Sequence, residues 1–331
     1  MGIVKRIKML LLSLLAIVCL LVIGLLLYER LQQFLADRSY PRPGRLIDVG
    51  GHGLHAVVAG QGSPSVIFES GLGIDGHLSW YKVQGPVAEF AQTVSYDRAG
   101  VFWSERGDNP KTAEAISMEL ARLLASGGID PPYILVGHSL AGITLRPFIA
   151  EHLDDIVGIV FVDVSHPDQL NRYPAEMRDR VSSAPPPFLM KLMRSLGYIR
   201  YRVASGPRPT EDLDDPYATV VPTMIHRSVG VQQEGENLEA MANEVAHITD
   251  FGSVPLVVVT GANPSRYDSM PYSQAVRDEL EDTWHTMQDE LLELSSNSRR
   301  ILATGSDHYV QISEPEIVID AIRSIVESHA E

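Results

Sequence analysis

The protein has 331 residues, of which 45% are hydrophobic and 21% charged, and this ordinary globular composition excludes the collagen-like, coiled-coil and disordered classes. Its 27 lysines and arginines against 42 aspartates and glutamates give a net charge of −15, which argues against a nucleic-acid partner because phosphate binding needs a basic surface. The single cysteine excludes an intrachain disulfide and a cysteine-based zinc cluster.

The first thirty residues predict a membrane anchor. Lysines and arginine at 5–8 precede an uncharged run over 9–27, which is long enough to cross a hydrocarbon core as a helix. Cations before an apolar span favour the cytoplasmic side, and the small-x-small site of a cleaved secretory signal does not follow the run. We therefore expect a cytoplasmic tail at 1–8, an uncleaved signal-anchor at 9–28, and a single-pass membrane protein whose remaining residues lie outside the cytoplasm.

The segment after the span predicts a linker over 29–45, because Tyr-Pro-Arg-Pro-Gly at 40–44 breaks any helix that continues from the membrane. Beyond it, strand patterns alternate with helix patterns. Strands are expected at 54–59, 65–68, 93–96, 134–136, 156–162, 255–260 and 301–303, and helices at 80–90, 112–126, 140–152 and 315–326. This alternation predicts an α/β fold with a mostly parallel sheet, helices on both faces, and ligand sites beyond the carboxyl ends of the strands.

The interval at about 165–250 breaks the alternation, because it carries no strong strand pattern. We predict that it forms a helical lid inserted over the sheet. Its apolar residues would either line a substrate pocket or pack the lid onto the sheet, and they are Phe188, Leu189, Met190, Leu192, Met193, Leu196 and Tyr198.

Ser139 is the candidate nucleophile. Gly-His-Ser-Leu-Ala at 137–141 follows one apolar strand pattern and opens a helix pattern, and it matches G-x-S-x-G with Ala141 in place of the last glycine. A serine in such a sharp turn projects its hydroxyl outward, beside the unpaired N–H groups of a helix N-terminus. The alternative is a serine that only caps the helix, but a strand before it and a helix after it favour the nucleophile.

Together with this turn, further passages resemble the α/β-hydrolase-fold serine hydrolases, in particular the bacterial esterase and lipase-like enzymes. They are Glu-Ser-Gly-Leu-Gly at 69–73, Tyr-Asp-Arg-Ala-Gly-Val-Phe-Trp-Ser at 96–104 and Gly-Ser-Asp-His-Tyr-Val at 305–310. The second resembles D-R-x-G-x-G-x-S, with Phe102 in place of its second glycine. The resemblance implies an α/β-hydrolase domain over 46–331, an oxyanion loop after the third strand, and a histidine after the last strand.

The resemblance points to His308 as the general base, because it follows the last strand and the order serine, acid, histidine suits this fold. His138, next to the nucleophile, is expected to be structural. His166 is the rival base, although it comes early in the chain for this fold. We expect backbone N–H groups of Leu72 and Leu140 to form the oxyanion hole.

The acid of the triad has two candidates. Asp163 directly follows the strand at 156–162, where some relatives carry the acid, and a carboxylate there would fix the tautomer of the imidazole. Asp268 lies in the loop after the next strand, where the family more often carries it. Asp163 is our first choice; its alternative role is a strand-end aspartate that makes a turn hydrogen bond.

These residues predict a serine hydrolase that cleaves a carboxylic ester, or an amide, through a covalent acyl-enzyme. The expected partner is a hydrophobic small-molecule or lipid-like ester, and no metal or cofactor is called for because the P-loop, GxGxxG and HExxH motifs are lacking. Ser139 argues against the dehalogenase and epoxide-hydrolase relatives, which use an aspartate nucleophile. The alternatives are a non-catalytic ligand-binding receptor or scaffold on the same fold, and an acyltransferase.

Overall fold

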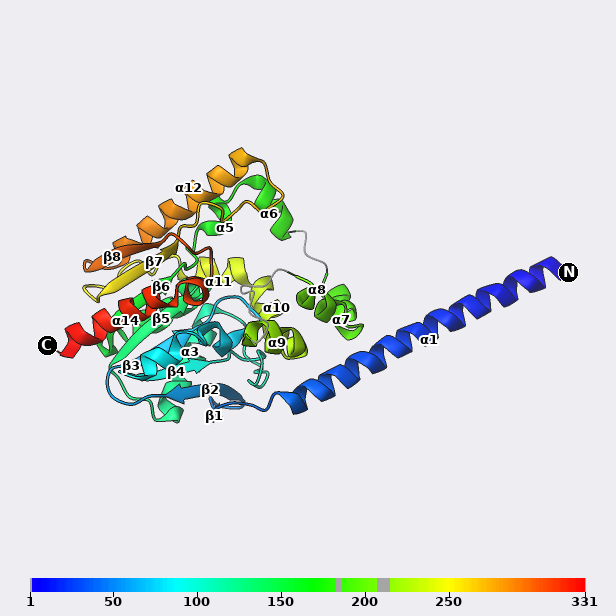
Figure 1. Ribbon diagram of the computed structural model, residues 1–331, viewed down its shortest axis with the longest axis horizontal. Coiled ribbons are helices and arrows are strands. Elements are labelled where there is room, and N and C mark those ends of the chain that lie inside the picture. Colours follow the sequence, from blue (N-terminus) through cyan, green and yellow to red (C-terminus); the bar gives the residue numbers. More distant parts are fainter. Residues whose placement is uncertain (1, 183–185, 207–214, 331) are drawn as a thin grey trace.

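The computed structural model describes residues 2–182, 186–206 and 215–330. Within them, eight strands form one sheet in the order β1-β2-β4-β3-β5-β6-β7-β8 (Figure 1). The strands are β1 Arg45–Asp48, β2 Gly53–Ala59, β3 Ser65–Glu69, β4 Gln92–Tyr96, β5 Tyr133–His138, β6 Ile156–Val162, β7 Leu256–Gly261 and β8 Ser298–Ala303. Strand β2 pairs antiparallel with β1 and β4, and the other pairs are parallel. The predicted mostly parallel sheet is confirmed.

Helices lie on both faces of the sheet. The α-helices are α1 Gly2–Ser39, α2 Gln84–Ala88, α3 Ala113–Gly127, α4 Ala141–Glu151, α5 Gln169–Arg172, α6 Ala175–Ser182, α7 Pro187–Ser195, α8 Tyr198–Ala204, α9 Pro216–Thr223, α10 Val229–Glu236, α11 Leu238–Val245, α12 Gln274–Glu290, α13 Val310–Ser313 and α14 Pro315–Ala330. Short 3-10 helices occupy Gly76–Trp80, Leu153–Asp155, Ile225–Arg227 and Leu291–Leu294.

The core has two halves because alternate side chains of a strand point to opposite faces. Ile67 of β3 packs with Leu120 of α3 and Phe148 of α4 on one face. Its neighbour Phe68 packs with Val87 of α2 and other apolar residues on the opposite face, where α14 also lies. Strands β3, β5, β6 and β7 are therefore almost entirely buried, whereas the edge strand β8 is partly exposed.

Helices α5 to α11 fill the interval between β6 and β7, as the predicted helical lid requires. Residues 183–185 and 207–214 of that interval lie outside the described residues. The expected apolar lining is wrong for part of this segment, because Phe188 is 74% exposed, Leu192 49% and Tyr198 42%. The two short helices that carry these residues, α7 and α8, lie beside α1 (Figure 1).

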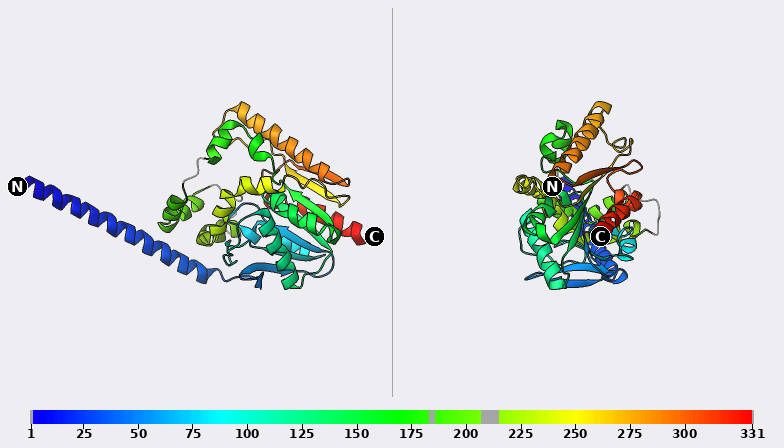
Figure 2. Two further views of the ribbon diagram at one scale, coloured as in Figure 1. Left: turned by 180° about the vertical axis from the view of Figure 1, so that it is seen from behind. Right: turned by 90° about the vertical axis from the view of Figure 1, so that its left-hand side faces the viewer.

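Helix α1 projects far beyond the sheet (Figure 2). Among the described residues it is the one helix whose length and apolar composition would allow it to cross a membrane, and its most apolar window is 0% buried. The linker predicted over 29–45 is helical as far as Ser39, because neither glycine nor proline interrupts 25–39, and β1 begins at Arg45. Irregular backbone is confined to 40–44, where Pro41 and Pro43 end the helix.

Candidate active site

The turn between β5 and α4 holds Ser139 in the left-handed backbone region, at φ 52°. This is an uncommon conformation for a residue with a side chain, and it is typical of a constrained functional turn. Two hydrogen bonds hold the backbone of Ser139. Its N–H donates to Val162 O of β6 at 3.3 Å, and its carbonyl accepts from Ser165 N at 2.7 Å. A Cβ atom added to Gly71 would come 2.8 Å from Ser139 Cβ, so the loop after β3 can approach the serine only as glycine.

His308 connects the serine to a carboxylate. Its Nε2 lies 2.9 Å from Ser139 Oγ, and its Nδ1 lies 2.7 Å from Asp163 Oδ2. Since a carboxylate only accepts, Nδ1 carries the proton and Nε2 is free to accept the hydroxyl hydrogen. The structure therefore brings together a serine, a histidine and an aspartate that are far apart in the sequence, in the arrangement that activates a nucleophile.

Asp163 is fully buried at the end of β6, with φ 47°. Its Oδ1 accepts from the Gly261 N–H at 3.0 Å and from the Trp284 indole at 2.9 Å, and the Arg266 guanidinium contacts both oxygens at 2.6 and 3.1 Å. Burial opposes ionisation of this carboxyl, but Arg266 and the hydrogen bond from His308 outweigh it and hold the pKa of Asp163 well below its usual range. The Asp163 carboxyl is thus ionised at neutral pH.

The structure places the rival acid and the rival base elsewhere. Asp268 is exposed, and its backbone N–H donates to Ser265 O. His166 lies 3.6 Å from Glu290 and lines a separate polar cavity of about 530 Å³ with Arg146. The loop that carries Asp268 instead supplies Arg266, a cation that the serine–acid–histidine pattern of the sequence does not predict.

His138 is buried beside His308, with the ring centroids 4.6 Å apart. Its Nε2 donates to the backbone carbonyl of His308 at 2.9 Å, so it holds the loop that carries the imidazole. Burial, together with the neighbouring His308, lowers the pKa of His138 to about 3. His138 is therefore neutral at physiological pH, which suits a positioning role.

The loop after β3 is held by Arg98. Its Nη1 donates to Ser70 O at 2.6 Å and its Nη2 to Gly71 O at 2.7 Å, directly before Leu72. Glu69 and Glu234 flank the same guanidinium at 2.7 and 2.8 Å, and all three charged groups are buried. On the other side of Ser139, Leu140 is the N-cap residue of α4, where backbone N–H groups have no acceptor within the helix. Leu72 thus follows the glycine that lies against Ser139, and Leu140 follows Ser139 itself.

An apolar pocket of about 240 Å³ opens beside the imidazole. Its walls are Tyr173, Met177, Arg266, Tyr267, Met270, Leu280, Trp284, Asp307 and His308. Arg266 contributes the flat face of its guanidinium, which lies 4.9 Å from the centroid of Trp284 and 5.3 Å from that of Tyr267. The pocket therefore offers aromatic and aliphatic side chains to a group bound next to His308.

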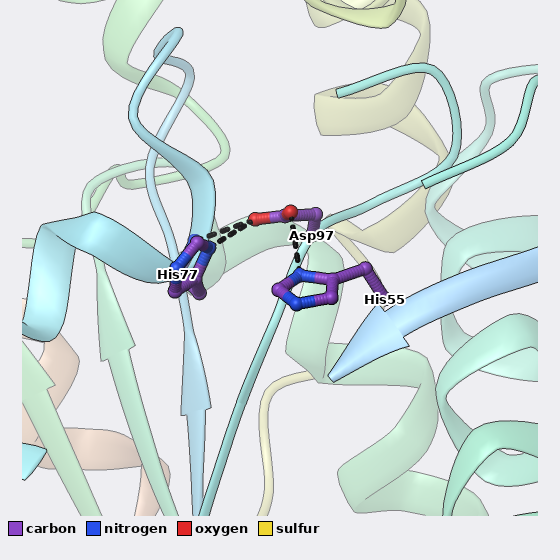
Figure 3. Close-up of side chains that lie close together, drawn as sticks. All are labelled: His55, His77 and Asp97. Carbon is purple, nitrogen blue, oxygen red and sulfur yellow. Dashed lines mark hydrogen bonds and ion pairs between the residues drawn. The ribbon is translucent and has the colours of Figure 1, made fainter. Parts of the chain in front are cut away.

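Among the described residues, one histidine and carboxylate cluster has the composition of a metal site: His55, His77 and Asp97 (Figure 3). Asp97 Oδ2 accepts from His55 Nδ1 at 2.8 Å and from Trp103 N at 3.3 Å, while Oδ1 accepts from His77 Nδ1 at 2.9 Å and from His77 N at 2.8 Å. Each carboxylate oxygen is saturated by two donors, so the cluster fits a hydrogen-bonded brace better than a metal site. Through His77, this cluster holds the end of the loop that follows β3, and Arg98 holds the beginning of the same loop.

A curated relative is the Hormonema carpetanum protein named "Probable transporter efuK", 28% identical over 329 residues that cover 88% of this chain and 44% of that protein. This chain thus spans less than half of that relative's length. Among solved structures, the epoxide hydrolase CorEH has 17% identity and a TM-score of 0.61, with 86% of this chain and 97% of that chain covered. An esterase from Thermogutta terrifontis has 17% identity, a TM-score of 0.54 and the same coverage.

Both structural similarities establish the fold and leave the reaction open, because enzymes of different chemistry share it. A family model described as the alpha/beta hydrolase family matches residues 66–321, which contain Ser139, Asp163 and His308. The chain therefore belongs to the alpha/beta hydrolase family.

Proposed function

We propose that the protein is a membrane-anchored serine hydrolase that cleaves a carboxylic ester through a covalent acyl-enzyme. The observation that carries the proposal is the chain of contacts from Ser139 Oγ through His308 to Asp163, at 2.9 and 2.7 Å. A serine at this turn also distinguishes the protein from relatives with an aspartate nucleophile. An amide is the second bond type that the same chemistry could cleave.

In the first half of the reaction, Ser139 Oγ attacks the carbonyl carbon while His308 Nε2 takes the hydroxyl proton. The negative charge that develops on the carbonyl oxygen is assigned to the backbone N–H groups of Leu72 and Leu140. Asp163 stabilises the imidazolium that forms. The tetrahedral intermediate then collapses, the carbon–oxygen bond to the leaving group breaks, and His308 returns its proton to the departing alcohol.

In the second half, water takes the place of the alcohol. His308 removes a proton from the water as it attacks the acyl-enzyme, and the imidazolium then protonates Ser139 Oγ as the acid is released. The products are one carboxylic acid and one alcohol. An acyltransferase would differ only in that an alcohol or an amine takes the place of the water.

The substrate side of the proposal is a hydrophobic small molecule or a lipid-like ester. The apolar 240 Å³ pocket next to His308 supports an apolar group on the substrate. The exposed apolar window of α1 supports attachment to a membrane, with residues 1–8 cytoplasmic, the anchor over 9–28, and the domain over 46–331 outside the cytoplasm.

The test uses the purified full chain in detergent with p-nitrophenyl esters of increasing acyl length and the matching anilides. We expect the wild-type chain to hydrolyse the esters, and Ser139→Ala to lose the activity while it keeps the circular dichroism spectrum of the wild type. The matched control is Ser324→Ala on α14, which should retain activity. Folded wild-type protein that hydrolyses none of these compounds would favour the receptor, and acyl products on an added alcohol would favour the transferase.

A further inference from the structure

The helix pair α7–α8 differs in charge from the rest of the chain. Residues 187–204 contain four cations, namely Lys191, Arg194, Arg200 and Arg202, and neither aspartate nor glutamate, whereas the whole protein has a net charge of −15. The same stretch carries Phe188, Tyr198 and Tyr201. A short basic helix with an apolar aromatic face is the composition typical of segments that lie at a membrane surface.

The apolar side chains of this pair are exposed. Phe188 is 74% exposed, Tyr201 65% and Leu192 49%. The residues of 186–206 whose side chains are described include no buried one. Large exposed side chains that gather on one element indicate a contact that the isolated chain leaves uncovered.

The pair is attached to α1 where the apolar run of that helix ends. Glu29, two residues after Leu27, is buried and forms an ion pair with Arg200 at 2.9 Å. Gly197, the N-cap residue of α8 at φ 77°, lies close to that carboxylate, since an added Cβ would come 3.0 Å from Glu29 Oε2. A second link, from Asp37 to Arg227 at 2.8 Å, fixes α1 to the same part of the lid.

Exposure along α1 is lower on the face that carries Glu29. Val22 is 37% exposed and Leu26 38%, whereas Leu20 is 68% and Leu27 66% exposed. Val22, Leu26 and Glu29 share one face because they are four and three residues apart. Figures 1 and 2 both show α7 and α8 on the side of the domain from which α1 projects.

We propose that α7 and α8 rest on the surface of the membrane that α1 enters, with Phe188 and Leu192 at the acyl boundary and the exposed cations Lys191 and Arg202 on anionic phospholipid headgroups. The inference rests on the membrane anchor of the proposed function. The length of α1 agrees with it: 38 residues span about 57 Å, more than the roughly 30 Å of a hydrocarbon core, so the helix continues outside the bilayer where α8 meets it. The lid would then be held at the lipid surface both by its ion pairs with α1 and by the contact of α7 and α8 with the lipid.

The test places a fluorescent label on the pair in the full chain. In a Cys19→Ser background, Leu192→Cys is labelled with nitrobenzoxadiazole and the protein is reconstituted in vesicles of phosphatidylcholine and phosphatidylglycerol. The matched control is Leu302→Cys on β8, because Leu302 is 51% exposed and Leu192 49%. We expect the label at 192 to emit at shorter wavelength and to be quenched by lipids that carry a doxyl group near the headgroup, while the label at 302 does neither.

The outcomes distinguish failure of this inference from failure of the membrane anchor or of the proposed hydrolase activity. A label at 192 that behaves like the label at 302 overturns the proposal, and so does a blue-shifted label that doxyl lipids do not quench, because another protein surface would then cover it. Charge reversal by Lys191→Glu with Arg202→Glu, or vesicles of phosphatidylcholine alone, should reduce the quenching; equal quenching overturns the assignment to anionic headgroups. Flotation of the chain with vesicles tests the anchor, and hydrolysis of a soluble short-chain ester tests the active site, each independently of the label.

Discussion

Arg266 lies against Asp163 with both terminal nitrogens of its guanidinium, Nη2 at 2.6 Å from Oδ2 and Nη1 at 3.1 Å from Oδ1. The same arginine donates to the Gly261 carbonyl at 2.9 Å and is itself largely buried. A buried carboxylate that has to stabilise an imidazolium needs a fixed position and a negative charge. Arg266 fixes the position of the Asp163 carboxylate and keeps it ionised, so it is a positioning residue for the proposed triad.

Replacement of Arg266 by glutamine should reduce kcat at pH 7 by roughly 10- to 100-fold, by analogy with the loss of a partner that orients a metal-binding side chain. The physical reason is that burial then raises the pKa of Asp163, so activity should be lost at a higher pH than in the wild type. The measurement is the pH profile of kcat. Arg266→Lys should restore part of the rate, and an unchanged profile in Arg266→Gln would contradict the role.

The two candidate acids can be separated by paired substitutions. Asp163→Asn should lower kcat by orders of magnitude, about 10⁴ in the serine protease precedent, because the amide cannot stabilise the imidazolium. Asp268→Asn should stay close to the wild type, since that side chain is exposed. Steady-state kinetics on one ester decide the question, and the reverse order of effects would show that Asp268 is the acid.

His138 should make the folded state sensitive to acid. Its pKa is about 3 in the folded chain, against the ordinary 6.5 of an exposed histidine, so between these pH values the unfolded chain binds a proton that the folded chain does not. The free energy of unfolding should therefore fall as the pH drops below about 6.5, by about 1.4 kcal/mol per pH unit for this one proton.

His138→Gln removes that proton and can still donate to the His308 carbonyl. Urea unfolding at a series of pH values from 4 to 8 should give a shallower pH dependence for the variant than for the wild type. Parallel curves would mean that His138 is not the group responsible.

Gly71→Ala tests the close approach of the loop to the nucleophile. The new methyl would lie 2.8 Å from Ser139 Cβ and 3.0 Å from His138 Nδ1, closer than non-bonded carbons tolerate, so the loop or the serine has to move. A displacement of about 1 Å at a reacting group costs on the order of 10² in rate. Ester turnover should fall accordingly in Gly71→Ala, while Gly85→Ala, where nothing lies within 4 Å of the new methyl, should keep its rate.

The elements that position the site follow strong local patterns, and these were predictable. Strand β6, Ile156–Val162, has the predicted bounds because an almost entirely apolar run is typical of a strand that is buried on both faces. Ser139 and Asp163 directly follow such strands, at the edge of the sheet where the carboxyl ends meet. The parallel sheet brings them to the same edge as His308, which follows β8, but the hydrogen bonds among the three side chains depend on the tertiary structure.

The missed elements carry weak local signals. Strand β1, Arg45–Asp48, is a four-residue edge strand with one buried side chain, so it has no apolar run to detect. Helix α12, Gln274–Glu290, is mostly polar and buries Leu280, Trp284, Met287 and Gln288, and it was not predicted. The bond from Trp284 to Asp163 joins residues 121 positions apart and has no local signature.

The central claim is that Ser139 is a nucleophile activated by His308. Its most direct test is reaction of the full chain with a fluorophosphonate, followed by peptide mass spectrometry to locate the adduct. We predict one adduct on Ser139, formed far more slowly in His308→Ala and at the wild-type rate in His166→Ala. Folded wild-type protein that acquires no adduct on Ser139, or that reacts equally fast without His308, would contradict the account.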